Sequence, residues 1–288
     1  MRMGAELDIY VESLATYNAV RGYAIKTLLP HLTEAGIAYR ILDRPEKSGA
    51  ARKALLHLDL TELPDSYRDL AAQYDGAING GALSIHRFLY STLRLSEGDA
   101  HGGAVVVKTV LNARGRPEVR LRRSRNRWTR MRYLLGKLLV PGFRERAAPH
   151  YRVYRSVGEV PKKVWRDARL MVEKYAFDSL EMPIVKHRYL FMLGAELNIK
   201  QVYNDPLCSS AKIISSEAVG PPPQEVMAVR RQLKLDYGAI DYFIVEGRGV
   251  VVDANKTMGS SAAWMEQYQF RRDFNMQMAN ALIDFVRN

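Results

Sequence analysis

Cysteine is almost absent from this chain, because Cys208 is the only one among 288 residues. A disulfide within the chain is therefore excluded, which is typical of proteins in a reducing compartment, and we expect a cytoplasmic protein. A cysteine-based zinc site is excluded as well, and the six histidines are scattered along the chain. Cys208 has no activating neighbour in the sequence, so we interpret it as structural.

Long hydrophobic runs are also missing. No stretch approaches the roughly 20 apolar residues of a membrane-spanning helix. Charges interrupt the apolar residues of the first ten positions, unlike those of a signal peptide. Hydrophobic residues nevertheless make up 47% of the chain, which is enough for a substantial core. We therefore expect a folded protein with one large domain or two smaller ones.

Positive charge dominates, but it is concentrated in one segment. Residues 114–146 contain twelve Arg and Lys against two Glu, a net charge of +10 out of +12 for the whole chain. Trp128 and Tyr133 interleave these charges, as aromatics do on nucleic-acid surfaces. The segment could also form a solvated helical face or lie on an anionic membrane. We favour an insertion near the functional site that attracts an anionic substrate, an acidic carrier or a peptide.

The first 97 residues show alternating strand and helix patterns. Strands are expected near 6–15, 37–42, 55–59 and 76–80, and helices near 16–36, 64–72 and 85–95. This β-α-β alternation predicts a small α/β unit.

A hairpin near the end carries the most informative polar residues. Two β-like runs, 238–245 and 250–255, flank a glycine-rich turn at 246–249. Asp253 and Asn255 are two apart, so both point to one face of their strand, and Asp241 can approach from the first strand. Three oxygen ligands of this kind suit Mg²⁺. The alternative is that Asp253 and Asn255 belong to a turn and Asp241 is a solvated edge charge.

This hairpin resembles the metal-binding core of the ATP-grasp superfamily, through Gly238-x-x-Asp241 followed by Asp253-x-Asn255-Lys256-Thr257. The resemblance covers about residues 1–265. It implies an α/β (α+β) fold in which two α+β lobes clamp ATP, preceded by a small N-terminal α/β domain. The domains implied are 1–97 and 98–288, the latter divided into a small lobe, 98–172, and a C-terminal lobe, 173–288. By resemblance, magnesium binds Asp241, Asp253 and Asn255.

Further positions of the resemblance follow in the family's order. Lys108, at the end of an apolar strand, would contact the α- and β-phosphates, and residues 112–118 would form a glycine-containing loop over the phosphates. Arg188 would contact the β- and γ-phosphates. Arg87 stands near the place where many relatives have an earlier phosphate-binding lysine.

The resemblance also places the base and the sugar of ATP. The strand ending in Glu173, Lys174 and Tyr175 resembles the family's hinge, which meets adenine. Asp178 or Glu181 would hold the ribose hydroxyls.

The activity implied by the resemblance is that of an ADP-forming ligase that forms a carbon–nitrogen bond. It would activate a carboxylate as an acyl-phosphate for capture by an amine or another nucleophile, with Arg188 and Lys108 as catalytic groups and ATP and Mg²⁺ as cofactors. The partners would be carboxylate and amine substrates, either small molecules or peptides, and a homodimer is compatible with the sequence. A kinase on the same fold remains open, as does a basic nucleic-acid or anionic-surface binding protein, which we do not favour.

Overall fold

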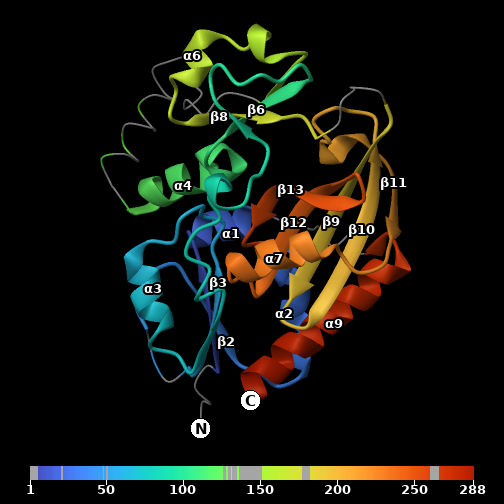
Figure 1. Ribbon diagram of the computed structural model, residues 1–288. Helices are drawn as coiled ribbons and strands as arrows, with labels where there is room; N and C mark the ends of the chain where they lie inside the picture. The colour runs from blue at the N-terminus through green and yellow to red at the C-terminus, as the bar shows by residue number, and fades with distance from the viewer. Residues whose placement is uncertain are drawn as a thin grey trace.

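The computed structural model describes residues 6–20, 22–47, 49, 51–125, 128, 131, 135, 151–176, 182–259 and 266–288. Three β-sheets organise this part of the chain (Figure 1). One is parallel and N-terminal, a small antiparallel sheet follows it, and a larger antiparallel sheet carries the C-terminal strands. No helix in the described ranges is long and apolar enough to cross a membrane.

The N-terminal sheet has the strand order β2-β1-β3-β4, with every neighbouring pair parallel. Its strands are β1 (Leu7–Val11), β2 (Tyr39–Leu42), β3 (Lys53–His57) and β4 (Gly76–Ile78). The accompanying helices are α1 (Leu14–Ala19), α2 (Ile25–Glu34) and α3 (Asp65–Ala71). All five residues of β1 are buried, as expected for a parallel strand covered on both faces. The β-α-β alternation expected from the sequence is present, although residues 16–36 contain two helices and not one.

The small antiparallel sheet has the order β5-β8-β6-β7. Its strands are β5 (Arg94–Leu95), β8 (Leu170–Lys174), β6 (Val105–Thr109) and β7 (Arg152–Tyr154), and the short elements η3 (Val157–Glu159) and α6 (Lys162–Trp165) accompany it. The helix predicted at 85–95 is wrong. This stretch forms the 3₁₀ turn η1 (Arg87–Leu89) and then strand β5, because Arg94 and Leu95 pair with β8.

The phosphate loop expected at 112–118 is also wrong in its secondary structure. The 3₁₀ turn η2 (Asn112–Gly115) runs directly into helix α4 (Arg116–Arg125). Pro117 lies in the first turn of α4, where its fixed φ and missing N–H are tolerated. Glu118 also lies in that turn, and its Oε1 accepts a hydrogen bond from the Thr61 backbone N–H at 2.8 Å. The start of α4 is thereby attached to the N-terminal unit.

The large antiparallel sheet has the order β11-β10-β9-β12-β13. Its strands are β9 (Ile184–Met192), β10 (Ala195–Tyr203), β11 (Ile213–Ala218), β12 (Tyr237–Val245) and β13 (Arg248–Asn255), with η4 (Ser210–Lys212), α7 (Gln224–Gln232) and α9 (Gln269–Arg287) around them. The hairpin predicted at 238–255 is confirmed as β12 and β13. In its turn, Glu246 and Gly247 both have positive φ, as a two-residue turn between twisted strands requires.

One hydrophobic core joins the N-terminal and large sheets. Leu7 and Ile9 of β1 belong to the same buried cluster as Met192 and Tyr237 of the large sheet and Met278 of α9. Helix α9 lies beside α2 and the strands β9 and β10 (Figure 1). The carboxyl ends of β1 and β3 are therefore fixed relative to the end of β13. Strand β5 precedes residue 97 yet pairs within the small sheet, and the division 1–97 and 98–288 stays a prediction.

Candidate active site

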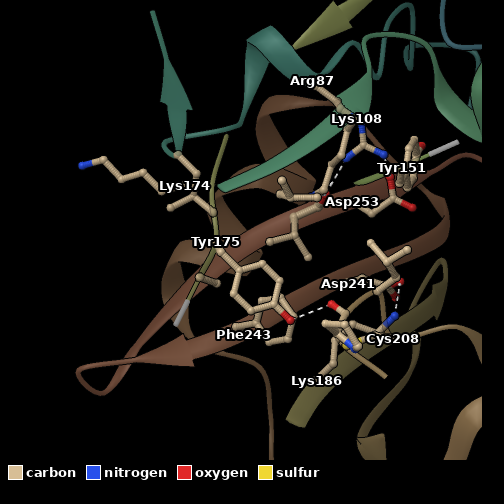
Figure 2. Close-up of a pocket in the computed structure, with 16 residues that line it drawn as sticks. Arg87, Lys108, Tyr151, Lys174, Tyr175, Lys186, Cys208, Asp241, Phe243 and Asp253 are labelled. Atoms are coloured by element: carbon tan, nitrogen blue, oxygen red, sulfur yellow. Dashed lines mark hydrogen bonds and ion pairs between the residues drawn. The ribbon is translucent and has the colours of Figure 1, made fainter. Parts of the chain in front are cut away.

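A cavity lies between the small antiparallel sheet and the large one (Figure 2). Its empty volume is about 630 Å³, including space open to solvent. The lining residues are Arg87, Leu93, Val106, Lys108, Tyr151, Lys174, Tyr175, Ala176, Lys186, Pro206, Leu207, Cys208, Asp241, Phe243, Val252 and Asp253. Arg87, Lys108, Asp241 and Asp253, which the sequence singled out as charged ligands, therefore line one cavity, although they come from four separate parts of the chain.

One part of this cavity is apolar and aromatic. Tyr175 and Phe243 lie close together there, with Val106 and Leu207 also in the lining (Figure 2). The hydroxyl of Tyr175 donates to the carbonyl oxygen of Pro206 at 2.6 Å, which fixes the ring. Apolar and aromatic walls with a few polar groups are typical of small-molecule sites, and this part suits a flat heterocycle.

Lys108 is held at the cavity by a buried carboxylate. Its Nζ lies 2.9 Å from Oε2 of Glu173 and donates to the carbonyl oxygen of Val252 at 3.3 Å. Burial acts to raise the pKa of Glu173, but Lys108 and Arg87 outweigh it and hold the pKa below its ordinary value. Ser91 donates a further hydrogen bond to Glu173. Glu173, expected at the adenine hinge, is therefore the counter-ion of Lys108, and it is only 1% exposed.

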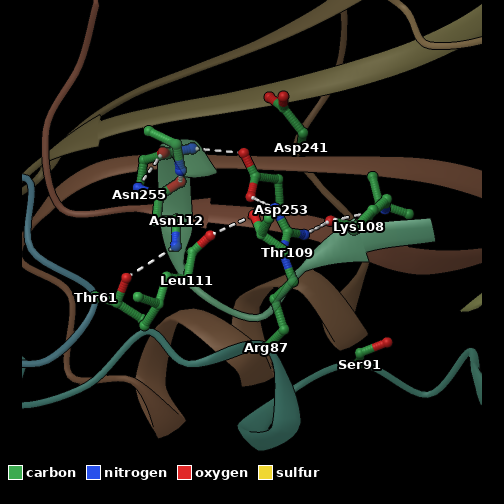
Figure 3. Close-up of polar contacts among 12 residues, drawn as sticks. Thr61, Arg87, Ser91, Lys108, Thr109, Leu111, Asn112, Asp241, Asp253 and Asn255 are labelled. Carbon is green, nitrogen blue, oxygen red and sulfur yellow. Dashed lines mark hydrogen bonds and ion pairs between the residues drawn. The ribbon is translucent and has the colours of Figure 1, made fainter. Parts of the chain in front are cut away.

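Arg87 reaches the strand that carries two of the expected metal ligands. Its guanidinium lies 2.6 Å from Oδ1 of Asp253 and donates to the carbonyl oxygen of Val252 (Figure 3). The residue is 3% exposed, so the ion pair fixes the start of η1 against β13. A buried arginine of this kind needs such a partner, because an unpaired charge is costly in the interior.

Asp241 lies opposite Asp253 on β13 and opposite Arg188 on β9. Lys186 Nζ is 3.1 Å from its Oδ2, and Arg188 is 3.3 Å from its Oδ1. Burial acts to raise the pKa of Asp241, but Arg188 and Lys186 outweigh it and hold the pKa below its ordinary value. Sequence reasoning missed Lys186. Its spacing of two from Arg188 on one strand, which places both on one face, is the signal that could have found it.

Asn255 completes the polar group at the end of β13. Its Nδ2 donates to Oδ2 of Asp253 at 3.1 Å, and its Oδ1 accepts from Asn112 Nδ2 at 2.8 Å (Figure 3). The predicted same-face arrangement of Asp253 and Asn255 is thus present, and Asp241 lies across from it on β12. Asn112, placed by resemblance in a phosphate loop, contacts a predicted metal ligand instead.

The donor set fits Mg²⁺. Within the described ranges, no group of three or more His, Cys, Asp or Glu side chains could hold a metal ion. A cation here would use the two carboxylates, the Asn255 amide oxygen and groups from a substrate, which is how Mg²⁺ is usually held. Oδ1 of Asp241 is buried and, among the described atoms, accepts no hydrogen bond of good geometry. Its ionic partner is Arg188, 3.3 Å away, so a metal ion bound to this oxygen would lie close to that guanidinium.

A second polar cluster, also missed, borders the first. Glu12 follows β1 and Asp59 follows β3, and Oε1 of Glu12 accepts from the Asp59 backbone N–H at 2.9 Å. Burial and the nearby Glu12 carboxylate raise the pKa of Asp59 to about 7. Asp59 also accepts from Asn112 at 3.2 Å, which links it to Asn255. Their place in the sequence, just after two predicted strands, could have identified Glu12 and Asp59, because ligands bind at the carboxyl ends of parallel strands in α/β sheets.

The remaining expected residues are placed as follows. Lys174 is exposed, and its side chain extends away from the cavity (Figure 2). Asp178 and Glu181 lie outside the described residues, as does most of the basic segment 114–146.

Comparisons with known proteins support the fold and no finer relationship. No protein-family model matches the chain, and no curated protein matches it. Among solved structures, the macrocyclase MdnC bound with precursor peptide MdnA, from Microcystis aeruginosa MRC, aligns with a TM-score of 0.52 at 10% identity, over 98% of this chain and 99% of that one.

The ATP-grasp ligase PsnB, complexed with minimal precursor, Mg and ADP, also aligns with a TM-score of 0.52 at 10% identity, over 99% of this chain and 97% of that one. Both alignments span all three sheets. The chain has the fold of the ATP-grasp superfamily.

Proposed function

We propose that this protein is an ATP-dependent, ADP-forming ligase that activates a carboxylate as an acyl-phosphate. The observation that carries the proposal is one cavity in which an aromatic part lies beside three cationic side chains, Arg87, Lys108 and Lys186, and two facing carboxylates. A nucleotide triphosphate needs this combination of a flat apolar surface, positive groups and metal ligands.

Each part of the cavity has a role in nucleotide binding. Tyr175 and Phe243 pack against the base, and Lys108 and Arg87 face the phosphates from the cavity lining. Arg188 approaches the phosphates from beside Asp241, its ion-pair partner. Positive groups fixed before the substrate enters stabilise the charge that spreads over the transferring phosphoryl group. The Lys108–Glu173 pair holds one such group in place at little reorganisation cost.

Asp241, Asp253 and Asn255 would hold magnesium. Bound Mg²⁺ would neutralise charge on the β- and γ-phosphate oxygens during transfer. The protein residues provide the hard oxygen donors and keep them in register across β12 and β13.

The reaction has two steps. A carboxylate oxygen of the substrate attacks the γ-phosphorus, the bond to the β-phosphate oxygen breaks, and ADP leaves. An amine then attacks the acyl carbon and releases inorganic phosphate. Asp59, with a pKa of about 7, can accept the proton of the amine near neutral pH. Its hydrogen-bonded link through Asn112 to Asn255, a proposed metal ligand, supports this role.

A peptide is a reasonable class of substrate. The structural neighbours MdnC and PsnB were solved with a precursor peptide and a minimal precursor, respectively. For this chain, the basic segment 114–146 adds a reason to expect an acidic peptide or carrier, because a local charge of +10 attracts anions.

The test combines binding and product analysis. Calorimetry with ATP and Mg²⁺ is expected to give saturable binding that Asp253→Asn weakens at least about tenfold, because a charged ligand is lost. Purified protein, offered carboxylates and amines, is expected to release ADP and inorganic phosphate. Phosphate retained on an acceptor would indicate a kinase, and no ATP binding at millimolar concentration would overturn the proposal.

A further inference from the structure

Every charged residue that is proposed to bind magnesium or phosphate already has an ionic partner within the chain. Asp253 pairs with Arg87, Lys108 pairs with Glu173, and Asp241 carries two cations, Lys186 and Arg188. Asp241 and Lys186 are 6% and 9% exposed, so their pair is largely removed from water. In such a buried pair each charge is stabilised by the other. Removing one charge is costly unless another group of the same sign takes its place.

Lys186 occupies the space that a metal bound to Asp241 would need. Its Nζ is 3.1 Å from Oδ2, and Arg188 is 3.3 Å from Oδ1 of the same carboxylate. A divalent cation that bound this carboxylate would be close to two positive groups, and their repulsion is strong at partly buried positions. Metal binding at Asp241 therefore requires Lys186 to move or to find a negative partner.

Lys186 can move without leaving the cavity. It is one of the lining residues, and its Nζ lies 5.0 Å from the centroid of the Tyr203 ring, which partly compensates its charge. A lysine has a flexible stem of four carbons and a compact charged head. Lys108, by contrast, has a buried carboxylate partner that is not an expected metal ligand.

We propose that Lys186 exchanges partners when substrate binds: in the free enzyme it neutralises Asp241, and with nucleotide present it turns to the phosphates and releases Asp241 to the metal. This inference rests on the proposed ATP binding and adds that the metal binds Asp241 tightly only once nucleotide is present. Metal alone binds weakly, because Lys186 competes for Asp241. Nucleotide and metal bind cooperatively, because the phosphates supply a new partner for the ammonium group.

The experiment uses Lys186→Met, which keeps most of the stem and removes the charge. Manganese or magnesium titrated into the nucleotide-free protein is expected to bind about tenfold more tightly to the variant than to wild type. ATP titrated in the presence of EDTA is expected to bind about tenfold more weakly, because one phosphate-binding cation is lost. A change in opposite directions for the two ligands is the signature of partner exchange.

Two further variants keep the test decisive. Lys186→Gln retains a hydrogen-bond donor for Asp241 and is used if Lys186→Met does not fold. Lys200→Met removes a partly exposed lysine of β10 that pairs with Glu217 at 2.8 Å, and both affinities are expected to stay at wild-type values.

The outcomes separate this inference from the proposed function. Wild type that binds ATP, with both affinities unchanged in Lys186→Met and only a lower melting temperature, would overturn partner exchange alone and make Lys186 structural. Wild type that binds no ATP with or without metal would overturn the proposed function together with the inference.

Discussion

Lys108 is the residue at which a role in transfer can be separated most cleanly from a role in stability. Lys108→Met is expected to lower kcat/KM about 10²-fold, because a group that stabilises developing phosphoryl charge is lost. It also leaves Glu173 buried without its ion-pair partner, which costs about 3 kcal/mol of stability. The double variant Lys108→Met/Glu173→Gln is expected to recover stability but not turnover, as measured by urea unfolding and ADP release.

The matched control is the exposed Lys174, whose side chain points away from the cavity (Figure 2). Lys174→Met is expected to leave both quantities near wild type. Turnover that returns with stability in the double variant would show that Lys108 acts only on the fold.

His57 gives a pH dependence at the same scale. The ring is 1% exposed among Tyr17, Tyr23 and Tyr237, and neither ring nitrogen has a hydrogen-bond partner among the described atoms. Burial lowers its pKa to about 3. Below pH 6.5 the unfolded chain takes up a proton that the folded protein does not, so stability falls as pH decreases toward 3.

Between pH 6.5 and 5 this one group is expected to remove about 2 kcal/mol from the unfolding free energy. Urea unfolding of wild type and His57→Phe at pH 7.5, 6.5 and 5 measures it, since the phenyl ring has no proton to gain. The loss between pH 6.5 and 5 is expected to be smaller in the variant by that amount. Equal losses in both proteins would mean that His57 is protonated in the fold.

At the scale of elements, Asn79 joins three strands. It lies just after β4 with φ of 62°, and its side chain donates to the carbonyl oxygens of Tyr237 and Lys256 at 2.8 and 3.0 Å. Its Oδ1 accepts from the backbone N–H groups of Asp236 and Tyr237, both at 3.0 Å. The N-terminal sheet is thus tied to the start of β12 and to the residue that follows β13.

Asn79→Ala is expected to lower the unfolding free energy by about 3–4 kcal/mol, because buried backbone groups lose partners and the left-handed backbone becomes strained. Asn79→Gly accepts that backbone, so it is expected to lose about 1 kcal/mol less. Chemical denaturation of wild type and the two variants measures the contribution of the hydrogen bonds and that of the backbone strain. A glycine variant as stable as wild type would show that the side-chain hydrogen bonds contribute nothing.

At the scale of the whole molecule, charge is distributed unevenly. Residues 114–146 carry +10, and the rest of the chain is close to neutral. The segment begins beside the site, since α4 follows the turn that contains Asn112. We expect it to attract an anionic acceptor over several ångströms, an effect that salt screens.

Replacing Arg122, Arg123, Arg125 and Arg127 by Gln is therefore expected to raise the KM of the acceptor several-fold at low salt and little at 0.5 M salt. The affinity for ATP is expected to change little, because Lys108, Arg87 and Arg188 remain. Steady-state kinetics over a salt series checks the first expectation and calorimetry the second. Weakened ATP binding with an unchanged acceptor KM would place the segment over the phosphates.

The sequence by itself determined the features that depend on local periodicity. Alternation along β13 places Asp253 and Asn255 on one face, and the short turn at Glu246 and Gly247 brings β12 alongside. These two relations need only the two-residue repeat of a strand and the geometry of a tight turn. The pairing of Asp241 with Asp253 depends in addition on a register shift between Asp241 and Tyr242, which local periodicity does not predict. The order of Lys108, Arg188 and Asp241 along the chain completed the resemblance to the ATP-grasp fold.

Only the tertiary structure decided which distant groups come into contact and where tertiary contacts override a local secondary-structure preference. Residues 85–95 show a helical pattern, yet pairing with β8 and the buried Arg87–Asp253 ion pair impose a turn and a strand. The contact of Lys186 with Asp241 and the link from Asp59 through Asn112 to Asn255 join separate elements of the chain. No local repeat encodes such pairs, because their free energy comes from removing charges and apolar surface from water together, which happens only when the sheets pack.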